Sequence, residues 1–364
     1  MKLFEPIKIG RMRLENRIAM TSLVTRLATE DGFVTDNLEK HYLRIANGGV
    51  GMITVEAAAI ISRRSPFNLK ICDDKYITSL RNLVKRIHKE TRTKLSIQLV
   101  HFLKLSRNGY RQKVEELKSE EIEQIVADFE KAALRVNEAD FDALELHCAH
   151  AYTLASFLSL LNRRKDEYGG SLEGRIRIVA EIMQRIKEKV DKELTIGCRI
   201  NADEFVVGGN TLEQSKHIAI ELAKLGVGYV SVSVGGKYED APILSDTGLP
   251  WPYSGYSGHR CMPRAYMPYC VNVYLAEDIR RALREVGYRV PIIAAGKIPT
   301  PDLAESILQK RKADIIGLAR PLLCDPEWPR KAKEGKWDEI INCTYCGGCI
   351  DKDSKFEAVS CVRN

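Results

Sequence analysis

The feature that most constrains the fold is a regular alternation of short apolar runs with amphipathic helical patterns. Eight runs rich in aliphatic and β-branched residues recur along the chain, and helical patterns separate them. In the segment 119–138, for example, Ile122, Ile125, Val126 and Phe129 fall on one helical face. We expect strands at 18–23, 51–55, 95–100, 143–148, 194–200, 229–234, 291–295 and 314–318, and helices at 37–47, 76–91, 119–138, 172–190, 211–225, 275–286 and 301–309.

Strands that alternate with helices in this way predict an α/β protein built as a (β/α)8 barrel, also called a TIM barrel. An open doubly wound sheet is the alternative, but it requires a glycine-rich phosphate-binding turn after its first strand. The segment 20–26, MTSLVTR, contains no glycine. We therefore expect a barrel, followed by a short cysteine-rich segment near the C-terminus.

Charge and composition narrow the class of protein. The formal net charge of +7 is mild for a chain of 364 residues. No basic run is interleaved with aromatic residues, so we expect no nucleic-acid partner. The first residues lack an apolar signal core, and no run of about 18 apolar residues could span a bilayer. These features favour a cytoplasmic protein, in which the ten cysteines are more often thiols or metal ligands than disulfides.

A cluster of polar side chains follows the fourth expected strand. His147, His150 and Tyr152 lie within six residues at the end of the apolar run 143–148. The carboxyl ends of strands are where parallel α/β proteins bind ligands. Two imidazoles can donate hydrogen bonds to a developing oxyanion, and a nearby phenol can supply a proton. The cluster therefore predicts an active site at this strand end, although a single histidine there would more often be a satisfied core residue.

Four cysteines close to the C-terminus form the second candidate site. Cys343, Cys346 and Cys349 are spaced by two residues each, and Cys361 follows after eleven more. Thiolate sets of this kind bind either an iron–sulfur cluster or Zn²⁺. The spacing alone leaves both metals open.

Two long loops are expected at the carboxyl end of the barrel. The loop 101–118 is basic, and we expect the loop 235–272, rich in aromatic residues, to form a lid or a substrate wall. A weaker expectation is that basic residues of this face bind the phosphates of a CoA thioester, with a solvated basic surface or a docking patch for a partner as equal alternatives. These residues are Lys104, Arg107, Arg111, Lys113, Arg163, Arg164 and Lys165.

Six motifs in order carry a resemblance to a known family. They are GRMRLENRIAM at 10–20, QLVH at 98–101, FDALELHCAHAY at 141–152, NRRKDEYGGS at 162–171, CRIN at 198–201 and ADIIGLARPLLCDP at 313–326. Over its whole length the chain resembles the old yellow enzyme family of FMN-dependent ene-reductases. It is most similar to the iron–sulfur branch that contains 2,4-dienoyl-CoA reductase, trimethylamine dehydrogenase and bile-acid enoate reductases. The resemblance implies an FMN-binding barrel over 1–335 and a [4Fe-4S]-binding segment over 336–364.

The resemblance also implies which residues hold FMN. Gln98 matches the residue that bonds the pyrimidine edge of the flavin, and Arg199 matches the cation beside flavin N1. Backbone contacts to the ring are expected from Thr21, Ser22, Leu23 and Ala57. The phosphate is expected on backbone amides of Gly296, Lys297, Ala319 and Arg320.

Catalytic and metal-binding roles follow in the same way. His147 and His150 match the pair that binds the substrate carbonyl, and Tyr152 matches the proton donor. Cys343, Cys346, Cys349 and Cys361 match the ligands of a [4Fe-4S] cluster. The chain departs from the family pattern in three places near the substrate: Ala151 replaces a glycine, FLSLLN lacks the usual proline, and Lys104 ends an altered motif after His101. It also has one residue fewer between the second and third cysteines.

The implied function is reduction of the C=C bond of an α,β-unsaturated carbonyl compound, with an enoyl-CoA or aryl-CoA-derived thioester as one candidate substrate. Hydride would come from FMN N5, the proton from Tyr152, and electrons through the [4Fe-4S] cluster. The alternatives are an amine dehydrogenase of the trimethylamine dehydrogenase type and an electron-transfer subunit. No GxGxxG turn follows a strand, so we expect an electron-donating flavoprotein subunit or a missing C-terminal domain beyond Asn364. We also allow for a homo-oligomer.

Overall fold

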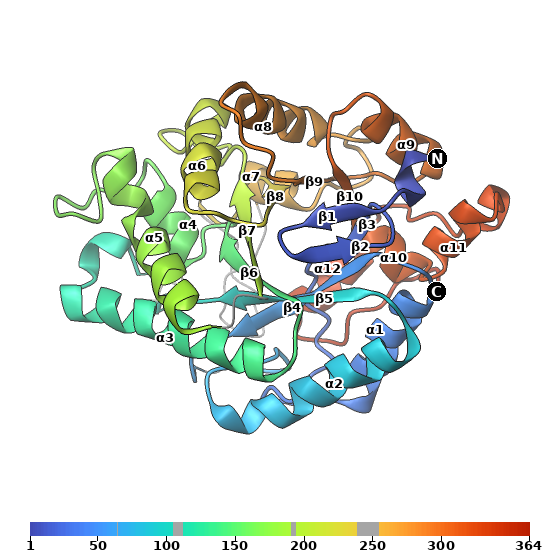
Figure 1. Ribbon diagram of the computed structural model, residues 1–364, viewed down its shortest axis with the longest axis horizontal. Helices are drawn as coiled ribbons and strands as arrows, with labels where there is room; N and C mark the ends of the chain where they lie inside the picture. Colours follow the sequence, from blue (N-terminus) through green and yellow to red (C-terminus); the bar gives the residue numbers. More distant parts are fainter. Residues whose placement is uncertain (64, 105–111, 191–193, 239–254) are drawn as a thin grey trace.

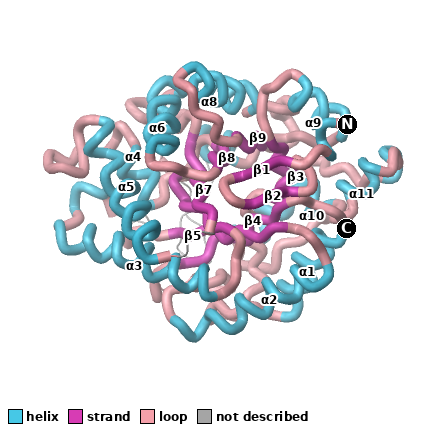
Figure 2. Tube along the Cα trace, in the orientation of Figure 1, coloured by secondary structure: helices cyan, strands magenta, loops and turns pink. Residues whose placement is uncertain are grey.

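The computed structural model describes residues 1–364 except 64, 105–111, 191–193 and 239–254. Eight parallel strands close into a barrel in the order β10-β3-β4-β5-β6-β7-β8-β9. Helices surround the strands, which occupy the centre of the view in Figure 1 and the magenta core of Figure 2. The pairing of β10 with β3 closes the ring. The prediction of a (β/α)8 barrel is confirmed, and the open-sheet alternative is excluded.

The barrel strands are β3 (Ile18–Met20), β4 (Met52–Ala59), β5 (Lys94–Val100), β6 (Ala143–Cys148), β7 (Thr195–Asn201), β8 (Tyr229–Ser233), β9 (Ile292–Ala295) and β10 (Ile315–Leu318). The outer helices are α1 (Asp36–Asn47), α2 (Ile77–Glu90), α3 (Ser119–Glu138), α5 (Leu172–Lys189), α6 (Leu212–Lys224), α8 (Val273–Glu285) and α9 (Pro301–Gln309). Shorter helices are α4 (Thr153–Leu158), α7 (Gly255–Cys261), α10 (Arg320–Cys324), α11 (Trp328–Lys333) and α12 (Gly348–Ser354). Every expected strand and helix is present, with shifts at the ends.

The largest differences from the expected strands occur at β3 and β4. β3 ends at Met20, because residues 21–25 turn across the carboxyl end of the barrel instead of continuing the strand. β4 runs on to Ala59 through an irregularity in its pairing with β5 between Val55 and Ala58. Such a bulge bends a strand and redirects its side chains.

A hairpin that was not expected from the sequence closes the amino end of the barrel. β1 (Ile7–Ile9) pairs antiparallel with β2 (Met12–Leu14). Ile9, Met12 and Leu14 are buried in one cluster with residues at the starts of barrel strands. The hairpin therefore covers the amino end of the barrel (Figure 1), so a functional site is expected at the carboxyl end.

The cysteine-rich segment packs on the carboxyl end of the barrel. Arg26, in the loop after β3, binds Asp353 of α12 with 2.7 Å between Nε and Oδ1. The backbone N–H of Val359 donates to the carbonyl of Thr25 at 2.8 Å. These contacts with the loop after β3, which is far away in sequence, therefore fix the position of the cysteine-rich segment.

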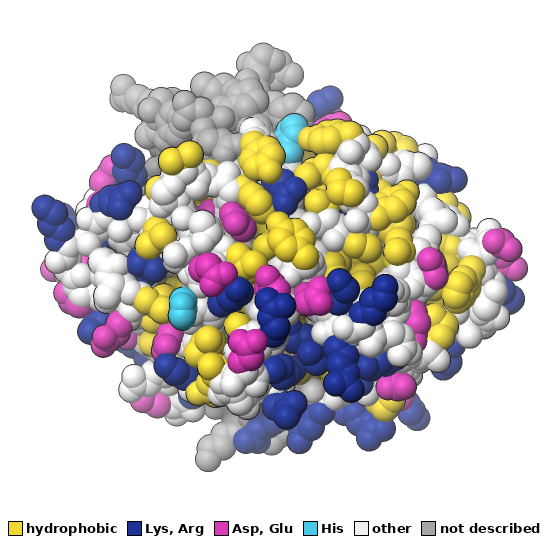
Figure 3. Space-filling view, turned by 90° about the horizontal axis from the view of Figure 1, so that it is seen from above, with side chains coloured by type: hydrophobic (Ala, Val, Ile, Leu, Met, Phe, Trp, Pro, Cys, Tyr) yellow, Lys and Arg dark blue, Asp and Glu magenta, His cyan; other side chains and the backbone are white. Residues whose placement is uncertain are grey.

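Lys and Arg side chains gather in the lower central part of the face seen in Figure 3, with Asp and Glu side chains among and above them. No helix in the described part of the chain is both long and apolar enough to cross a membrane.

Glu56, in the bulge of β4, anchors the loop after β3. Its carboxylate is fully buried and accepts hydrogen bonds from the backbone N–H of Thr25 at 3.0 Å and from the Thr25 hydroxyl. The Tyr42 hydroxyl donates to the same oxygen at 3.3 Å. Burial, the largest effect, raises the pKa of Glu56 from 4.5 to about 7.

We therefore expect Glu56 to make stability depend on pH. Between pH 4.5 and about 7 the folded protein keeps a proton that the unfolded chain loses. The contribution of Glu56 to the free energy of unfolding is complete below pH 4.5. It declines by about 1.4 kcal/mol per pH unit above that, until the pH passes the pKa of Glu56 in the folded protein, about 7. Urea unfolding of wild type and Glu56→Gln should show a difference in unfolding free energy that shrinks with rising pH. Glu204, whose pKa burial also raises to about 7, contributes equally to both proteins. A pH-independent difference would contradict this prediction.

Candidate active site

Three adjoining cavities lie at the carboxyl end of the barrel. We call them the histidine cavity, the glycine cavity and the cysteine cavity after the residues that define them. The histidine and glycine cavities share Ser22, Leu23, Arg199, Cys261 and Met262. Arg320 and Tyr345 line both the glycine and cysteine cavities, whereas Cys349 lines both the histidine and cysteine cavities. The three cavities therefore share walls. A hollow of about 380 Å³ at the amino end of the barrel has no acid or histidine in its lining.

The histidine cavity brings the predicted catalytic residues together. The rings of His147 and His150 lie 5.0 Å apart, and the Tyr152 ring lies 4.6 Å from that of His147. The backbone N–H of Ala149 approaches Nδ1 of His147 at 3.4 Å, which assigns the proton of a neutral ring to Nε2. Nε2 of His150 lies 2.6 Å from Oγ of Ser233, which fixes that ring.

Polar contacts orient the residues between the two cavities. Gln98 donates to Oε1 of Glu145 at 2.7 Å and accepts from the Ser22 hydroxyl at 3.1 Å. Arg199 donates from Nη1 to the Ser22 carbonyl at 3.1 Å, while its buried Nε has no hydrogen-bond partner among the described residues. An unsatisfied buried donor is costly, so this atom indicates a ligand with an acceptor at the shared wall.

The glycine cavity lies beside the ends of β9 and β10. Gly296 has φ +122°, and a Cβ there would approach the Asn272 side chain to 2.9 Å. Ala319 and Arg320 begin α10, whose first N–H groups have no acceptor within the helix. The Lys297 ammonium is hydrogen-bonded to backbone carbonyls and is not an unpaired cation at the glycine cavity. It donates to the carbonyls of residues 264 and 265 at 3.1 and 2.8 Å and to that of residue 267.

All thirteen residues predicted to contact FMN or substrate line one of these two cavities. The histidine cavity contains Ala57, Gln98, His147, His150 and Tyr152, and the shared wall contains Ser22, Leu23 and Arg199. The glycine cavity contains Thr21, Gly296, Lys297, Ala319 and Arg320. Their individual roles remain predictions.

The four predicted metal ligands line the cysteine cavity. Cys343, Cys346, Cys349 and Cys361 all face it. Gly347, with φ +91°, and the start of α12 at Gly348 allow the short spacing between the second and third cysteines. In the described residues no three Cys, His, Asp or Glu side chains are grouped closely enough to hold a single ion. Burial raises the pKa of Cys349 to about 11.

Several residues at these cavities were not anticipated from the sequence. Cys261 and Met262, from α7 and its end, line the shared wall. Ile350 and Asp353 of α12 complete the histidine cavity. The signal that could have identified Asp353 is its position one helical turn after Cys349, which places both side chains on one face of α12.

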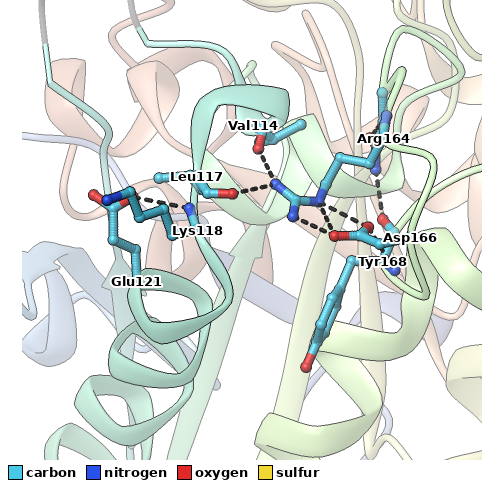
Figure 4. A network of polar contacts seen from close by, with 8 residues as sticks. Val114, Leu117, Lys118, Glu121, Arg164, Asp166 and Tyr168 are labelled. Atoms are coloured by element: carbon cyan, nitrogen blue, oxygen red, sulfur yellow. Dashed lines mark hydrogen bonds and ion pairs between the residues drawn. The ribbon is translucent and has the colours of Figure 1, made fainter.

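The expectations for the two long loops need correction. The Arg164 guanidinium donates to the carbonyls of Val114 and Leu117 at 2.6 and 2.7 Å and pairs with Asp166 (Figure 4). It therefore holds the loop together and is not available for CoA phosphates. Arg107 and Arg111 lie outside the described residues.

In the aromatic loop, Tyr256, Tyr266 and Tyr269 are more than half exposed and line none of the three cavities. These three tyrosines therefore form no part of a substrate wall, whereas residues 261–263 of the same loop do line the cavities. The expectation of a lid stays a prediction. Trp251 and Tyr253 lie outside the described residues.

Backbone strain marks the turn that carries the catalytic residues. His150 and Ala151 have φ of +61° and +60°. A Cβ in this left-handed region costs roughly 1–2 kcal/mol, which explains why the family pattern has glycine at position 151. We expect Ala151→Gly to raise the free energy of unfolding by about 1 kcal/mol. Ala155→Gly in the helix α4 should lower it, because glycine weakens helices. Chemical denaturation measures both, and equal losses in the two variants would contradict the interpretation.

Comparisons with known proteins place this geometry in a family. The model of the NADH:flavin oxidoreductase / NADH oxidase family matches residues 2–237 and 259–339. An NADH oxidase of Thermoanaerobacter brockii is 37% identical over 370 residues, which are 96% of this chain and 53% of that protein. An N,N-dimethylglycine/sarcosine dehydrogenase of Chromohalobacter salexigens is 28% identical over all of this chain and 52% of its own length.

A structure of 2-naphthoyl-CoA reductase with 2-naphthoyl-CoA superposes with a TM-score of 0.86 at 23% identity, over 100% of this chain and 57% of that one. That likeness shows the fold. The chain spans about half the length of these relatives. It belongs to the NADH:flavin oxidoreductase / NADH oxidase family, a family of FMN-dependent oxidoreductases. The resemblance to old yellow enzymes is thereby confirmed.

Proposed function

We propose that this chain is an FMN-dependent ene-reductase that reduces the C=C bond of α,β-unsaturated carbonyl compounds. The observation that carries the proposal is the convergence of His147, His150 and Tyr152 on a cavity that shares a wall with the glycine cavity. Bound FMN would supply the hydride. Amine oxidation, the alternative, has no need of a proton donor such as Tyr152.

The residues present fit FMN. The glycine cavity is lined by Ala319 and Arg320, whose backbone N–H groups at the start of α10 could bind a phosphate. The Nε of Arg199 lacks a partner among the described residues, and a guanidinium can stabilise negative charge on a flavin. Gln98, held by Glu145 and Ser22, can still offer its second amide hydrogen.

The histidine cavity supplies acid and oxyanion stabilisation. With Nδ1 of His147 facing an N–H, its Nε2–H can donate to a substrate carbonyl. The contact with Ser233 holds the His150 ring beside it. As the carbonyl is polarised, the phenol of Tyr152 donates a proton to the α-carbon, while the β-carbon receives the hydride.

We further propose that the cysteine cavity holds a [4Fe-4S] cluster. Four thiolates can also bind Zn²⁺, which needs all four sulfurs about 2.3 Å from one ion. Their arrangement around one cavity supports a larger centre. Cys349 lines the walls of both the cysteine cavity and the histidine cavity, so a cluster held by these cysteines would supply one-electron chemistry next to the flavin site.

Analysis of protein purified without oxygen tests both cofactors. We expect FMN in stoichiometric amount together with iron and acid-labile sulfide, and reoxidation of the reduced flavin by 2-cyclohexenone. Zinc instead of iron would overturn the cluster. Reduction of the flavin by a simple amine, with no reaction toward the enone, would favour the amine dehydrogenase alternative.

A further inference from the structure

The cysteine-rich segment places a carboxylate in the wall of the histidine cavity. Asp353 lies one helical turn after Cys349, and both residues line that cavity together with Ile350. The Asp353 side chain is only 15% exposed. Burial raises the pKa of this carboxyl, and Arg26 opposes that effect. A largely buried carboxylate in a cavity wall can accept hydrogen bonds from a ligand with any oxygen that the protein leaves open.

Within the described part of the chain, one of the two carboxylate oxygens has a hydrogen-bond partner. Oδ1 of Asp353 accepts from Nε of Arg26 at 2.7 Å. Among the described residues, Oδ2 forms no hydrogen bond. Arg26 cannot easily turn to satisfy it, because Nη1 of Arg26 donates to Asn68 Oδ1 at 2.6 Å and its guanidinium lies 4.8 Å from the Phe356 ring.

The lining of the histidine cavity indicates the ligand that Asp353 would take. Much of the histidine cavity is apolar, with Leu23, Val24, Ala57, Met262 and Ile350 in its lining. In such surroundings a carboxylate oxygen favours an ammonium or another strong hydrogen-bond donor and repels a second carboxylate.

We propose that Asp353 is a specificity-determining residue that selects unsaturated carbonyl substrates carrying a protonated amine or a comparable donor group. The carbonyl lies at His147 and His150, and the donor group binds Oδ2 of Asp353. This inference rests on the proposed function and names the substrate class of that site. It also gives the cysteine-rich segment a role in substrate recognition.

The competing explanation is that Asp353 only clamps α12 to the barrel through Arg26. Asp353→Asn distinguishes the two, because the amide oxygen can still accept from Arg26 whereas the charge is lost. Asp351→Asn is the matched control. Asp351 lies on the same helix, pairs with Arg264 at 3.0 Å and lines none of the three cavities.

Binding of saturated ketones to the oxidised holoenzyme, followed by calorimetry, tests the proposal without turnover. The probes are 3-(aminomethyl)cyclohexanone, 3-methylcyclohexanone and 3-oxocyclohexanecarboxylate. We expect wild type and Asp351→Asn to bind the ammonium ketone about tenfold or more tightly than the methyl ketone, as for a hydrogen bond to a charged group. The carboxylate should bind weakest. Asp353→Asn should lose the preference for the ammonium while its iron and FMN contents remain unchanged.

An ammonium preference that persists in Asp353→Asn would overturn the proposal. So would equal binding of the three ketones to wild type, a result that does not depend on how well the variant folds. Reoxidation of the reduced flavin by 2-cyclohexenone, which has no donor group, tests the proposed function separately. If 2-cyclohexenone reoxidises the flavin but the enzyme shows no preference for the ammonium ketone, only the role of Asp353 is refuted.

Discussion

Replacement of Tyr152 by Phe should slow reoxidation of the reduced flavin by 2-cyclohexenone by about 10²–10⁴-fold, the usual contribution of a positioned general acid. The phenol lines the histidine cavity and contacts His147, but it holds no part of the barrel core. The variant should therefore keep its FMN and bind the enone with similar affinity. Anaerobic stopped-flow absorbance, with enone concentration varied, separates the rate of the chemical step from binding.

Tyr168→Phe is the matched control for this prediction. The Tyr168 hydroxyl donates to Glu181 at 3.0 Å and lines none of the three cavities, so its loss should leave the reoxidation rate unchanged. If Tyr152→Phe reacts as fast as wild type, the proton comes from another group or from water. A rate lost equally in both variants would indicate a general effect on folding instead of acid catalysis.

The second large effect concerns the cysteine cavity. Cys346→Ala should lose its iron and acid-labile sulfide, because a cluster with four thiolate ligands depends on each of them. FMN should remain, since Cys346 lines neither the glycine nor the histidine cavity. Reduction of the flavin by a reduced low-potential carrier should then fall to the slow rate that a nicotinamide alone supports. Cys270→Ala is a control, because Cys270 lines none of the three cavities.

The sequence was sufficient for the barrel because its elements are long and strongly periodic. The alternation of buried strands with one-sided helices, as in α3, depends on local pattern. The turn after β6 was equally clear, since three chemically active side chains in six residues rarely serve packing alone. The hairpin β1–β2 was missed although Ile7, Ile9, Met12 and Leu14 alternate around Gly10, because each strand has only three residues.

Contacts between distant segments could not be predicted from local pattern. Asp353 enters the histidine cavity because Arg26, more than three hundred residues earlier, draws α12 onto the first loop. Arg164 was expected to bind an anionic group, yet the carbonyl oxygens of Val114 and Leu117 accept its hydrogen bonds. The sequence specifies these side chains, but only the folded chain decides which acceptors they meet.

The central claim is that electrons reach the flavin site through the cysteine cavity, which shares walls with both other cavities. Anaerobic stopped-flow reduction of the oxidised holoenzyme tests it most directly, with NADH, NADPH or a reduced low-potential carrier as the donor and with wild type and Cys346→Ala compared. The account predicts that wild type is reduced faster by the carrier than by either nicotinamide, and that Cys346→Ala loses this advantage. Rapid, saturable reduction by a nicotinamide alone, unchanged in Cys346→Ala, would contradict it.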